Sequence, residues 1–161
     1  MAAPIALSLR LEPATSPAAT ALFAGLNAEM VARYPGASPT GMNVAAFEAA
    51  GGVLAIGSVG ETPVCCGGFR PFDGDTAEIK RMYVAPAWRR RGFSRRLLAF
   101  IEAEAARRGF TRAVLETGTR EPEAIALYGS CGWQKIPPYG PFADDPLSVF
   151  FGKRLGTSAC D

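Results

Sequence analysis

The sequence contains no histidine among its 161 residues. This absence removes the commonest protein metal ligand and every nucleophile system that relies on a histidine base. No apolar run approaches the roughly 18 residues of a membrane-spanning helix, so no interaction with a membrane is expected. The N-terminus lacks the basic region, apolar core and cleavage site of a secretory signal, and a cytoplasmic protein is therefore predicted.

Cysteine and glycine spacings exclude two further classes of site. The four cysteines, at 65, 66, 131 and 160, form no Cys-x-x-Cys pair and match no zinc-binding pattern. Neither Gly-x-x-x-x-Gly-Lys-Ser/Thr nor Gly-x-Gly-x-x-Gly occurs, so the common phosphate-binding loops are absent. We therefore expect a protein that works without a metal ion.

The composition is that of one globular domain. Hydrophobic residues make up 48% of the chain and charged residues 20%, which allows a sizeable core and argues against disorder. We expect residues 1–155 to form a single domain and residues 156–161 to be a flexible C-terminal tail.

Hydrophobic periodicity predicts an α/β fold with a mixed, mostly antiparallel central sheet flanked by helices. Strands are predicted at 5–11, 52–58, 63–70, 76–84, 111–117, 132–136 and 147–154. Helices are predicted at 16–32, 43–50, 91–108 and 121–130. A turn is predicted at 71–75, so the second, third and fourth strands should form an antiparallel meander.

Positive charge is concentrated at one strand–helix junction. The formal net charge is only +2, but residues 80–96 hold seven bases and no acid, while the rest of the chain holds ten bases and fifteen acids. The seven bases are Lys80, Arg81, Arg89, Arg90, Arg91, Arg95 and Arg96. Free N–H groups at a helix start and arginine forks suit a polyanionic ligand such as a pyrophosphate. A solvated helix face is the alternative, and nucleic acid is not expected because the bases sit at a single junction.

The junction carries the pattern Val84-x-Pro86-x-x-Arg89-x-x-Gly92-x-Ser94. It resembles the acyl-CoA-binding motif of the GNAT superfamily of N-acetyltransferases, Arg/Gln-x-x-Gly-x-Gly/Ala. Ser94 departs from the last position, but serine is small and keeps its backbone N–H. The segment from Leu127-Tyr128 to Gly132-Trp133 is similar to the same superfamily's Leu-Tyr-x-x-x-Gly-Phe.

The resemblance implies a GNAT fold with splayed strands at the acyl-CoA site and acetyl-CoA as the co-substrate. The pantetheine arm of the co-substrate would pair with the backbone of Met82, Tyr83 and Val84. The diphosphate would lie on the loop and helix start formed by Arg89, Arg90, Arg91, Gly92, Phe93, Ser94 and Arg95.

The same resemblance implies that a primary amine attacks acetyl-CoA directly in a ternary complex. Tyr128 matches the tyrosine that donates a proton to the departing thiolate. Glu78 occupies the strand position where some members carry a general base, with Glu116 and water as the other candidates. An acyl-cysteine route through Cys131 is not expected, because the sequence offers no activating base for it.

Residues 33–36 and 137–142 are implied to line the acceptor groove. Candidate substrate contacts are Arg33, Tyr34, Arg70 and Tyr139. Arginine would suit a substrate carboxylate, as Arg120 also could, whereas Asp144 and Asp145 would suit a cationic amine. The leading hypothesis is an acetyltransferase acting on a small-molecule amine. The alternatives are a protein N-terminal or lysine acetyltransferase and a non-catalytic CoA-binding sensor, and a homodimer is suggested by analogy alone.

Overall fold

The computed structural model describes residues 2–36 and 42–156, so the predicted tail lies outside the described residues except for Gly156. The strands in this part are β1 (Ser8–Glu12), β2 (Val53–Val59), β3 (Thr62–Asp73), β4 (Thr76–Val84), β5 (Arg112–Gly118), β6 (Gln134–Lys135) and β7 (Ser148–Arg154). The helices are α1 (Pro17–Arg33), α2 (Val44–Ala49), α3 (Phe93–Arg107) and α4 (Pro122–Ser130), with a 3-10 turn at Pro86–Trp88.

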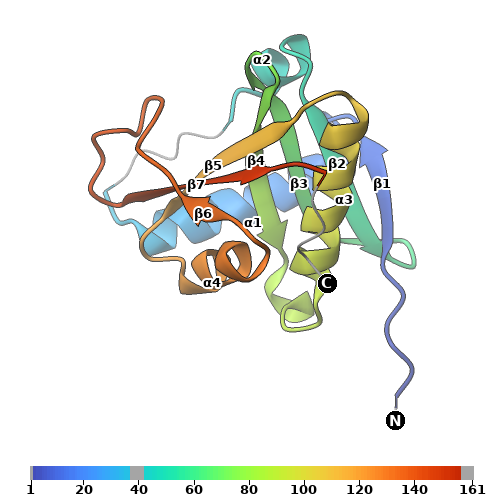
Figure 1. Cartoon of the computed structure of the whole chain (residues 1–161). Coiled ribbons are helices and arrows are strands. Elements are labelled where there is room, and N and C mark those ends of the chain that lie inside the picture. Colours follow the sequence, from blue (N-terminus) through green and yellow to red (C-terminus); the bar gives the residue numbers. More distant parts are fainter. Residues whose placement is uncertain (1, 37–41, 157–161) are drawn as a thin grey trace.

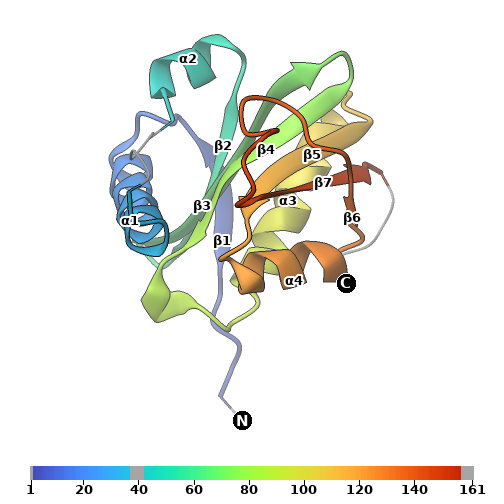
Figure 2. The same cartoon turned by 90° about the vertical axis from the view of Figure 1, so that its left-hand side faces the viewer.

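All these strands form one sheet in the order β1-β2-β3-β4-β5-β7-β6. The β4–β5 pair is parallel and the other neighbouring pairs are antiparallel, which confirms the mixed, mostly antiparallel sheet. Helices α1 and α2 lie on one face, and α3 and α4 lie on the other (Figures 1 and 2). In the described residues, no helix is both long and apolar enough to cross a bilayer.

Each face of the sheet carries its own hydrophobic core. The apolar face of α3 is buried against the sheet and the aromatic residues of α4 and β7, and it consists of Phe93, Leu97, Ile101 and Ala105. On the opposite face, a second core joins α1 and α2 to the strands. Helix α1 begins after Ser16, whose side chain accepts a hydrogen bond from the Ala19 N–H, as a capping serine does.

Two observed strands, β3 and β6, differ in length from the strands predicted there. Strand β3 runs to Asp73, three residues beyond the predicted end, because Pro71 and Asp73 still pair with β4. The predicted turn shrinks to Gly74-Asp75, where Gly74 adopts a left-handed φ of 55°. Strand β6 is only two residues long, because only Gln134 and Lys135 pair with β7.

Candidate active site

Strands β4 and β5 pair only at their beginnings. The register runs from Thr76 opposite Arg112 to Glu78 opposite Val114, and beyond that point the two strands diverge (Figure 1). Strand β4 nevertheless continues to Val84 and β5 to Gly118. Backbone groups along such a gap lack a strand partner and can hydrogen-bond an extended ligand. The expected splay is therefore confirmed.

A β-bulge accompanies the divergence. Between two paired positions, β3 advances from Cys66 to Gly68 while β4 goes from Tyr83 to Lys80, so β4 holds one extra residue. Arg81 adopts a left-handed φ of 62° in this bulge. A bulge bends its strand and increases the local twist, which turns the end of β4 away from β5.

Side-chain contacts to α1 hold the bulged residue in place. The Arg81 guanidinium donates to Asn27 Oδ1 at 2.6 Å and lies 5.4 Å from the centre of the Phe23 ring. Burial lowers the pKa of Arg81, because the charged guanidinium has lost much of its water. Arg81 therefore belongs to the support of β4 and not to a phosphate site.

The gap opens into a cleft of about 1460 Å³. Its walls come from the second half of α1, the ends of β4 and β5, the start of α3, and α4. Phe142, Leu147 and Ser148 close its far end. A cleft of this size admits a large ligand together with a second, smaller one.

The start of α3 faces this cleft with unpaired backbone donors. Gly92 precedes the helix with a left-handed φ of 77° and provides no side-chain cap, and Arg90 is also left-handed at 64°. The first N–H groups of a helix have no partner within it, and the positive end of the helix dipole lies there. Gly92, Phe93, Ser94 and Arg95 line the cleft, and alternating backbone conformations of this kind form a cradle for anions.

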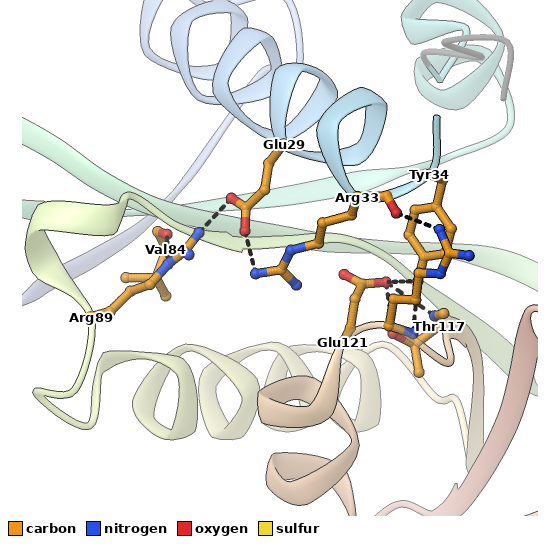
Figure 3. A network of polar contacts seen from close by, with 9 residues as sticks. Glu29, Arg33, Tyr34, Val84, Arg89, Thr117 and Glu121 are labelled. Carbon is orange, nitrogen blue, oxygen red and sulfur yellow. Dashed lines mark hydrogen bonds and ion pairs between the residues drawn. The ribbon is translucent and has the colours of Figure 1, made fainter. Parts of the chain in front are cut away.

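The arginine run does not converge on this cradle as a single cluster. Arg89 donates its Nε to the Val84 carbonyl at 2.8 Å and pairs with Glu29 of α1 at 2.5 Å (Figure 3). Arg95 donates to Ser130 Oγ at 2.5 Å, at the end of α4. Both side chains fasten the loop and helix to the rest of the fold.

Three arginines of the run remain. Arg96 donates to the Leu7 carbonyl at 3.1 Å, and Arg91 lies over the Trp88 ring at 5.4 Å, outside the lining of the cleft. Arg90 lines the cleft, and within the described residues no acid, carbonyl or ring engages its guanidinium. Positive charge at the cradle therefore comes from Arg90, from Arg95, whose partners are uncharged, and from the backbone N–H groups.

Tyr128 of α4 lies in the wall of the cleft and is only 4% exposed. Its ring packs against Trp133 at 5.8 Å and Phe151 at 5.9 Å. Burial, followed by the charges of Glu121 and Glu116, raises the pKa of Tyr128 well above its usual value. No described side chain hydrogen-bonds its hydroxyl, and the raised pKa means that this hydroxyl keeps its proton.

Glu116 of β5 also lines the cleft and is partly buried. Burial is the main reason that its pKa is raised, while the 3.2 Å hydrogen bond from Ser148 Oγ and the charge of Lys80 lower it. A carboxylate with a raised pKa is a stronger base than an ordinary one.

Glu78 of β4 is in a different environment. It is 5% exposed and lies with Tyr139 in a small pocket of about 40 Å³, which adjoins the large cleft because Lys80 and Glu116 line both. Its Oε1 accepts from Arg70 at 2.9 Å, and its Oε2 accepts from the Tyr139 hydroxyl at 3.0 Å. Both oxygens are thus engaged by protein donors, and Glu78 is not among the residues that line the large cleft.

Of the candidate acceptor contacts, Arg33, Tyr34 and Arg70 line the large cleft, whereas Tyr139 lies in the small pocket. Arg33 pairs with Glu29 at 2.7 Å. The Tyr34 hydroxyl accepts from the Arg120 N–H at 3.1 Å and lies 3.5 Å from Glu121 Oε2 (Figure 3).

Two residues that the sequence did not single out organise this site. Glu29 joins α1 to Arg89, and a Glu four residues before Arg33 in a helix is a recognisable signal for a pair. Glu121 lines the cleft and accepts from the Gly118 N–H at 3.0 Å. The only sequence signal for Glu121 is its place directly before Pro122 at a helix start.

Curated proteins that are similar to this chain in sequence include two acetyltransferase relatives. An IAA acetyltransferase of Azospirillum brasilense is 42% identical over 95 residues, which cover 58% of this chain and 62% of the relative. YsnE, an uncharacterised N-acetyltransferase of Bacillus subtilis, is 39% identical over 93 residues, or 56% of this chain and 61% of the relative. The matched stretch thus spans about three-fifths of these curated relatives.

Solved structures share the fold over almost the whole chain. A candidate acyl-CoA N-acyltransferase of Klebsiella pneumoniae superposes with a TM-score of 0.77 at 28% identity, covering 92% of this chain and 97% of its own. A GNAT acetyltransferase of Elizabethkingia anophelis with acetyl-CoA bound gives 0.72 at 18% identity, covering 92% and 98%. The family model "Acetyltransferase (GNAT) family" matches residues 22–133, a segment that includes the parted strands, the α3 start and Tyr128. The chain therefore belongs to the acetyltransferase (GNAT) family, as its motifs predicted.

Proposed function

We propose that this protein transfers an acetyl group from acetyl-CoA to a primary amine of a small molecule, by direct attack in a ternary complex. The observation that carries the proposal is that the β4–β5 gap and the open start of α3 face one cleft. A strand edge suits the amide groups of a pantetheine arm, and helix-start amides suit a diphosphate.

The residues present fit such a co-substrate. The backbone of Met82, Tyr83 and Val84 lies along the gap, and all three residues line the cleft. Arg90 and the amides that follow Gly92 would hold the diphosphate, with the Ser94 hydroxyl as a further donor. Acetyl-CoA supplies an activated acyl group, and backbone N–H groups of the gap would stabilise the charge that develops on the carbonyl oxygen.

The proton transfers fall to two side chains that line the cleft, Tyr128 and Glu116. As the amine nitrogen bonds to the acetyl carbon and the C–S bond breaks, Tyr128 donates its proton to the leaving thiolate. Glu116, directly or through a water molecule, accepts the proton that the amine loses. The products are the acetylated amine and CoA, and solvent restores both side chains to their starting protonation states.

The surroundings of the two carboxylates favour Glu116 over Glu78 as the base. Glu116 lines the cleft, and burial raises its pKa. Glu78, the first candidate from the sequence, has its oxygens bonded to Arg70 and Tyr139. Because these donors occupy both oxygens and Glu78 does not line the large cleft, Glu78 would reach an amine there only if these contacts opened.

Thermal shift with acetyl-CoA and thiol release with a panel of amines test the proposal together. Acetyl-CoA at 100 times its dissociation constant should add about 2.7 kcal/mol to the free energy of unfolding. Thiol release that depends on both acetyl-CoA and a small amine supports the enzyme. Stabilisation without thiol release from any amine or peptide would instead indicate a sensor, and release with peptides alone a protein acetyltransferase.

A further inference from the structure

Two opposite charges face each other where the sheet opens. Lys80 on β4 and Glu116 on β5 each lie two residues beyond the last paired positions, Glu78 and Val114. They therefore project from the same face on either side of the gap, and both line the large cleft. Lys80 also lowers the pKa of Glu116 against the larger effect of burial, so the two charges are close enough to interact.

Lys80 makes one ion-pair contact, and that contact is long. Arg70 and Lys80 share one carboxylate oxygen, Glu78 Oε1, at 2.9 Å and 3.8 Å respectively. The other oxygen of Glu78 accepts from Tyr139. Glu116 is the second carboxylate near Lys80, and in the described part of the chain no ion-pair partner of the Lys80 ammonium is nearer than Glu78. The Lys80 side chain is 30% exposed, on the cleft side.

The other cations at this end of the cleft are already occupied. Arg33 pairs with Glu29 at 2.7 Å. Arg120 donates to the Arg33 carbonyl at 2.9 Å and lies over the Tyr34 ring at 5.6 Å. At this end of the cleft, Lys80 is therefore the cation with the longest contact, and Arg70 is its neighbour on the same carboxylate oxygen.

The rim beside these charges is apolar. Val31, Phe142 and Leu147 are exposed large hydrophobic residues, and all three line the cleft. Solvent-facing apolar side chains grouped around a cleft favour a ligand with an apolar body.

We infer that the acceptor is an amino acid with an apolar side chain, bound with its carboxylate on Lys80 and Arg70 and its amine beside Glu116. This inference rests on the proposed function and adds the acceptor class to it. Lys80 acts as a specificity-determining residue. A cation on one strand and a carboxylate on the facing strand match the charges of the free amino acid, and the amine then loses its proton on the Glu116 side, where the acetyl group arrives.

A trio of matched amines tests the carboxylate contact. L-phenylalanine, L-phenylalaninamide and 2-phenylethylamine carry the same ring and a primary amine, but only the first carries a carboxylate. We expect Lys80→Gln to lower the ratio of kcat/KM for the acid to that for the amide by about tenfold, since a charge-assisted hydrogen bond contributes roughly 1.5–3 kcal/mol. The intrinsic reactivity of each amine is the same for every variant, so this change in ratio reports the contact alone.

Two variants serve as controls. Lys80→Arg keeps the positive charge and should retain most of the preference for the acid. Lys135→Gln removes an exposed lysine on β6, outside the cleft, and should leave the ratio at the wild-type value. A ratio that Lys80→Gln leaves unchanged, with thiol release intact, overturns the inference while the proposed function stands.

Product binding distinguishes failure of the inference from failure of the proposed function. N-acetyl-L-phenylalanine and its amide are titrated into the protein without acetyl-CoA, with binding followed by NMR. The acid should bind more tightly than the amide to the wild type, and Lys80→Gln should remove most of the difference. Absence of thiol release with every amine overturns the proposed function. Equal binding of acid and amide, or binding of neither, overturns the inference on its own.

Discussion

Glu29 of α1 and Arg89 of the loop before α3 form an ion pair of 2.5 Å between residues 60 positions apart in the sequence. Arg89 also donates to the carbonyl of Val84, the last residue of β4 (Figure 3). One guanidinium therefore fixes α1, the end of β4 and the loop proposed to hold the diphosphate relative to one another. The position of α1 and the shape of the proposed co-substrate site depend on the same contact.

Glu29→Gln should lower the free energy of unfolding by about 1–2 kcal/mol, because two arginines lose a partly buried partner. It should also raise the KM for acetyl-CoA, since the diphosphate loop loses its tie to α1. Urea unfolding and steady-state kinetics measure the two effects. Glu104→Gln is the matched control, because Glu104 also pairs with two arginines, Arg107 and Arg108, near the far end of α3. The interpretation fails if both variants have the same KM.

Tyr128→Phe should lower kcat by about 10²-fold or more while leaving the KM for acetyl-CoA nearly unchanged. The substitution removes the hydroxyl that we assign as the acid and keeps the ring that packs against Trp133 and Phe151. Thiol release under saturating acetyl-CoA provides the measurement. A kcat equal to that of the wild type would show that solvent protonates the thiolate.

The pH dependence of kcat/KM should distinguish Glu116 from Glu78. A base works only when deprotonated, and burial raises the pKa of Glu116, so activity should rise with pH through a value above the usual glutamate range. Glu116→Gln should remove this acid limb. Glu78→Gln should lower stability through its partners Arg70 and Tyr139 but keep the limb. The opposite pattern would make Glu78 the base.

The same raised pKa predicts a change in stability. Between the unfolded and folded pKa values of Glu116, the folded state binds more protons than the unfolded state, so its contribution to stability is lost as pH rises. Glu116→Gln should therefore flatten the fall in stability with pH over this window. Urea midpoints for wild type and variant from pH 4 upward provide the measurement, and parallel curves would contradict the burial-driven shift.

Arg90→Gln should weaken binding of acetyl-CoA by about tenfold and reduce its salt dependence, because a charge-assisted contact to phosphate contributes roughly 1.5–3 kcal/mol. Arg91→Gln should have a much smaller effect, since Arg91 lies over Trp88 and outside the cleft lining. Calorimetric titration at two salt concentrations compares them. Equal losses of affinity would show that the loop rearranges when the ligand binds.

A buried ion pair links α3 to β7. Lys153 Nζ lies 2.5 Å from Glu102 Oε1, and Glu102 Oε2 accepts from the Trp133 indole at 3.3 Å. Lys153→Met should lower the free energy of unfolding by about 3–5 kcal/mol, because it leaves Glu102 buried without its counter-charge. Adding Glu102→Gln should recover part of the loss, measured by urea unfolding. If the double variant is no more stable than Lys153→Met, the unpaired charge is not the cause.

Local patterns in the sequence predicted most of the fold. The helices predicted at 16–32 and 91–108 are observed at Pro17–Arg33 and Phe93–Arg107, because a capping serine and a four-residue apolar spacing act within a few residues. The bulge at Arg81 was not predicted, because it depends on the register between two strands and on contacts with Phe23 and Asn27 of α1.

The sequence predicted which strands, loop and helices form the candidate site, but it did not predict which way their side chains point. The pattern from Arg89 to Ser94 located the helix start correctly, because glycine and a left-handed backbone are local requirements. Counting bases could not show that Arg89 and Arg95 turn to partners on α1 and α4. The roles of Glu116 and Lys80 likewise depend on which strands separate, and that is a property of the whole sheet.

The extra residue in β4 changes which residues face each side of the sheet: odd-numbered residues face α3 before the bulge, and even-numbered residues face it afterwards. Ala77 and Ile79 point into the α3 core, yet beyond the bulge it is Met82 and Val84 that pack there, while Tyr83 packs against the α1 side. If β4 alternated regularly with Arg81 in place, Tyr83 would instead turn into the α3 core, whereas deleting Arg81 would remove the bulge and keep Tyr83 on the α1 side. The bulge at Arg81 thus separates the half of β4 that carries Glu78 and Lys80 from the half that carries Met82, Tyr83 and Val84, and a point substitution in either half leaves the facing of the other half unchanged.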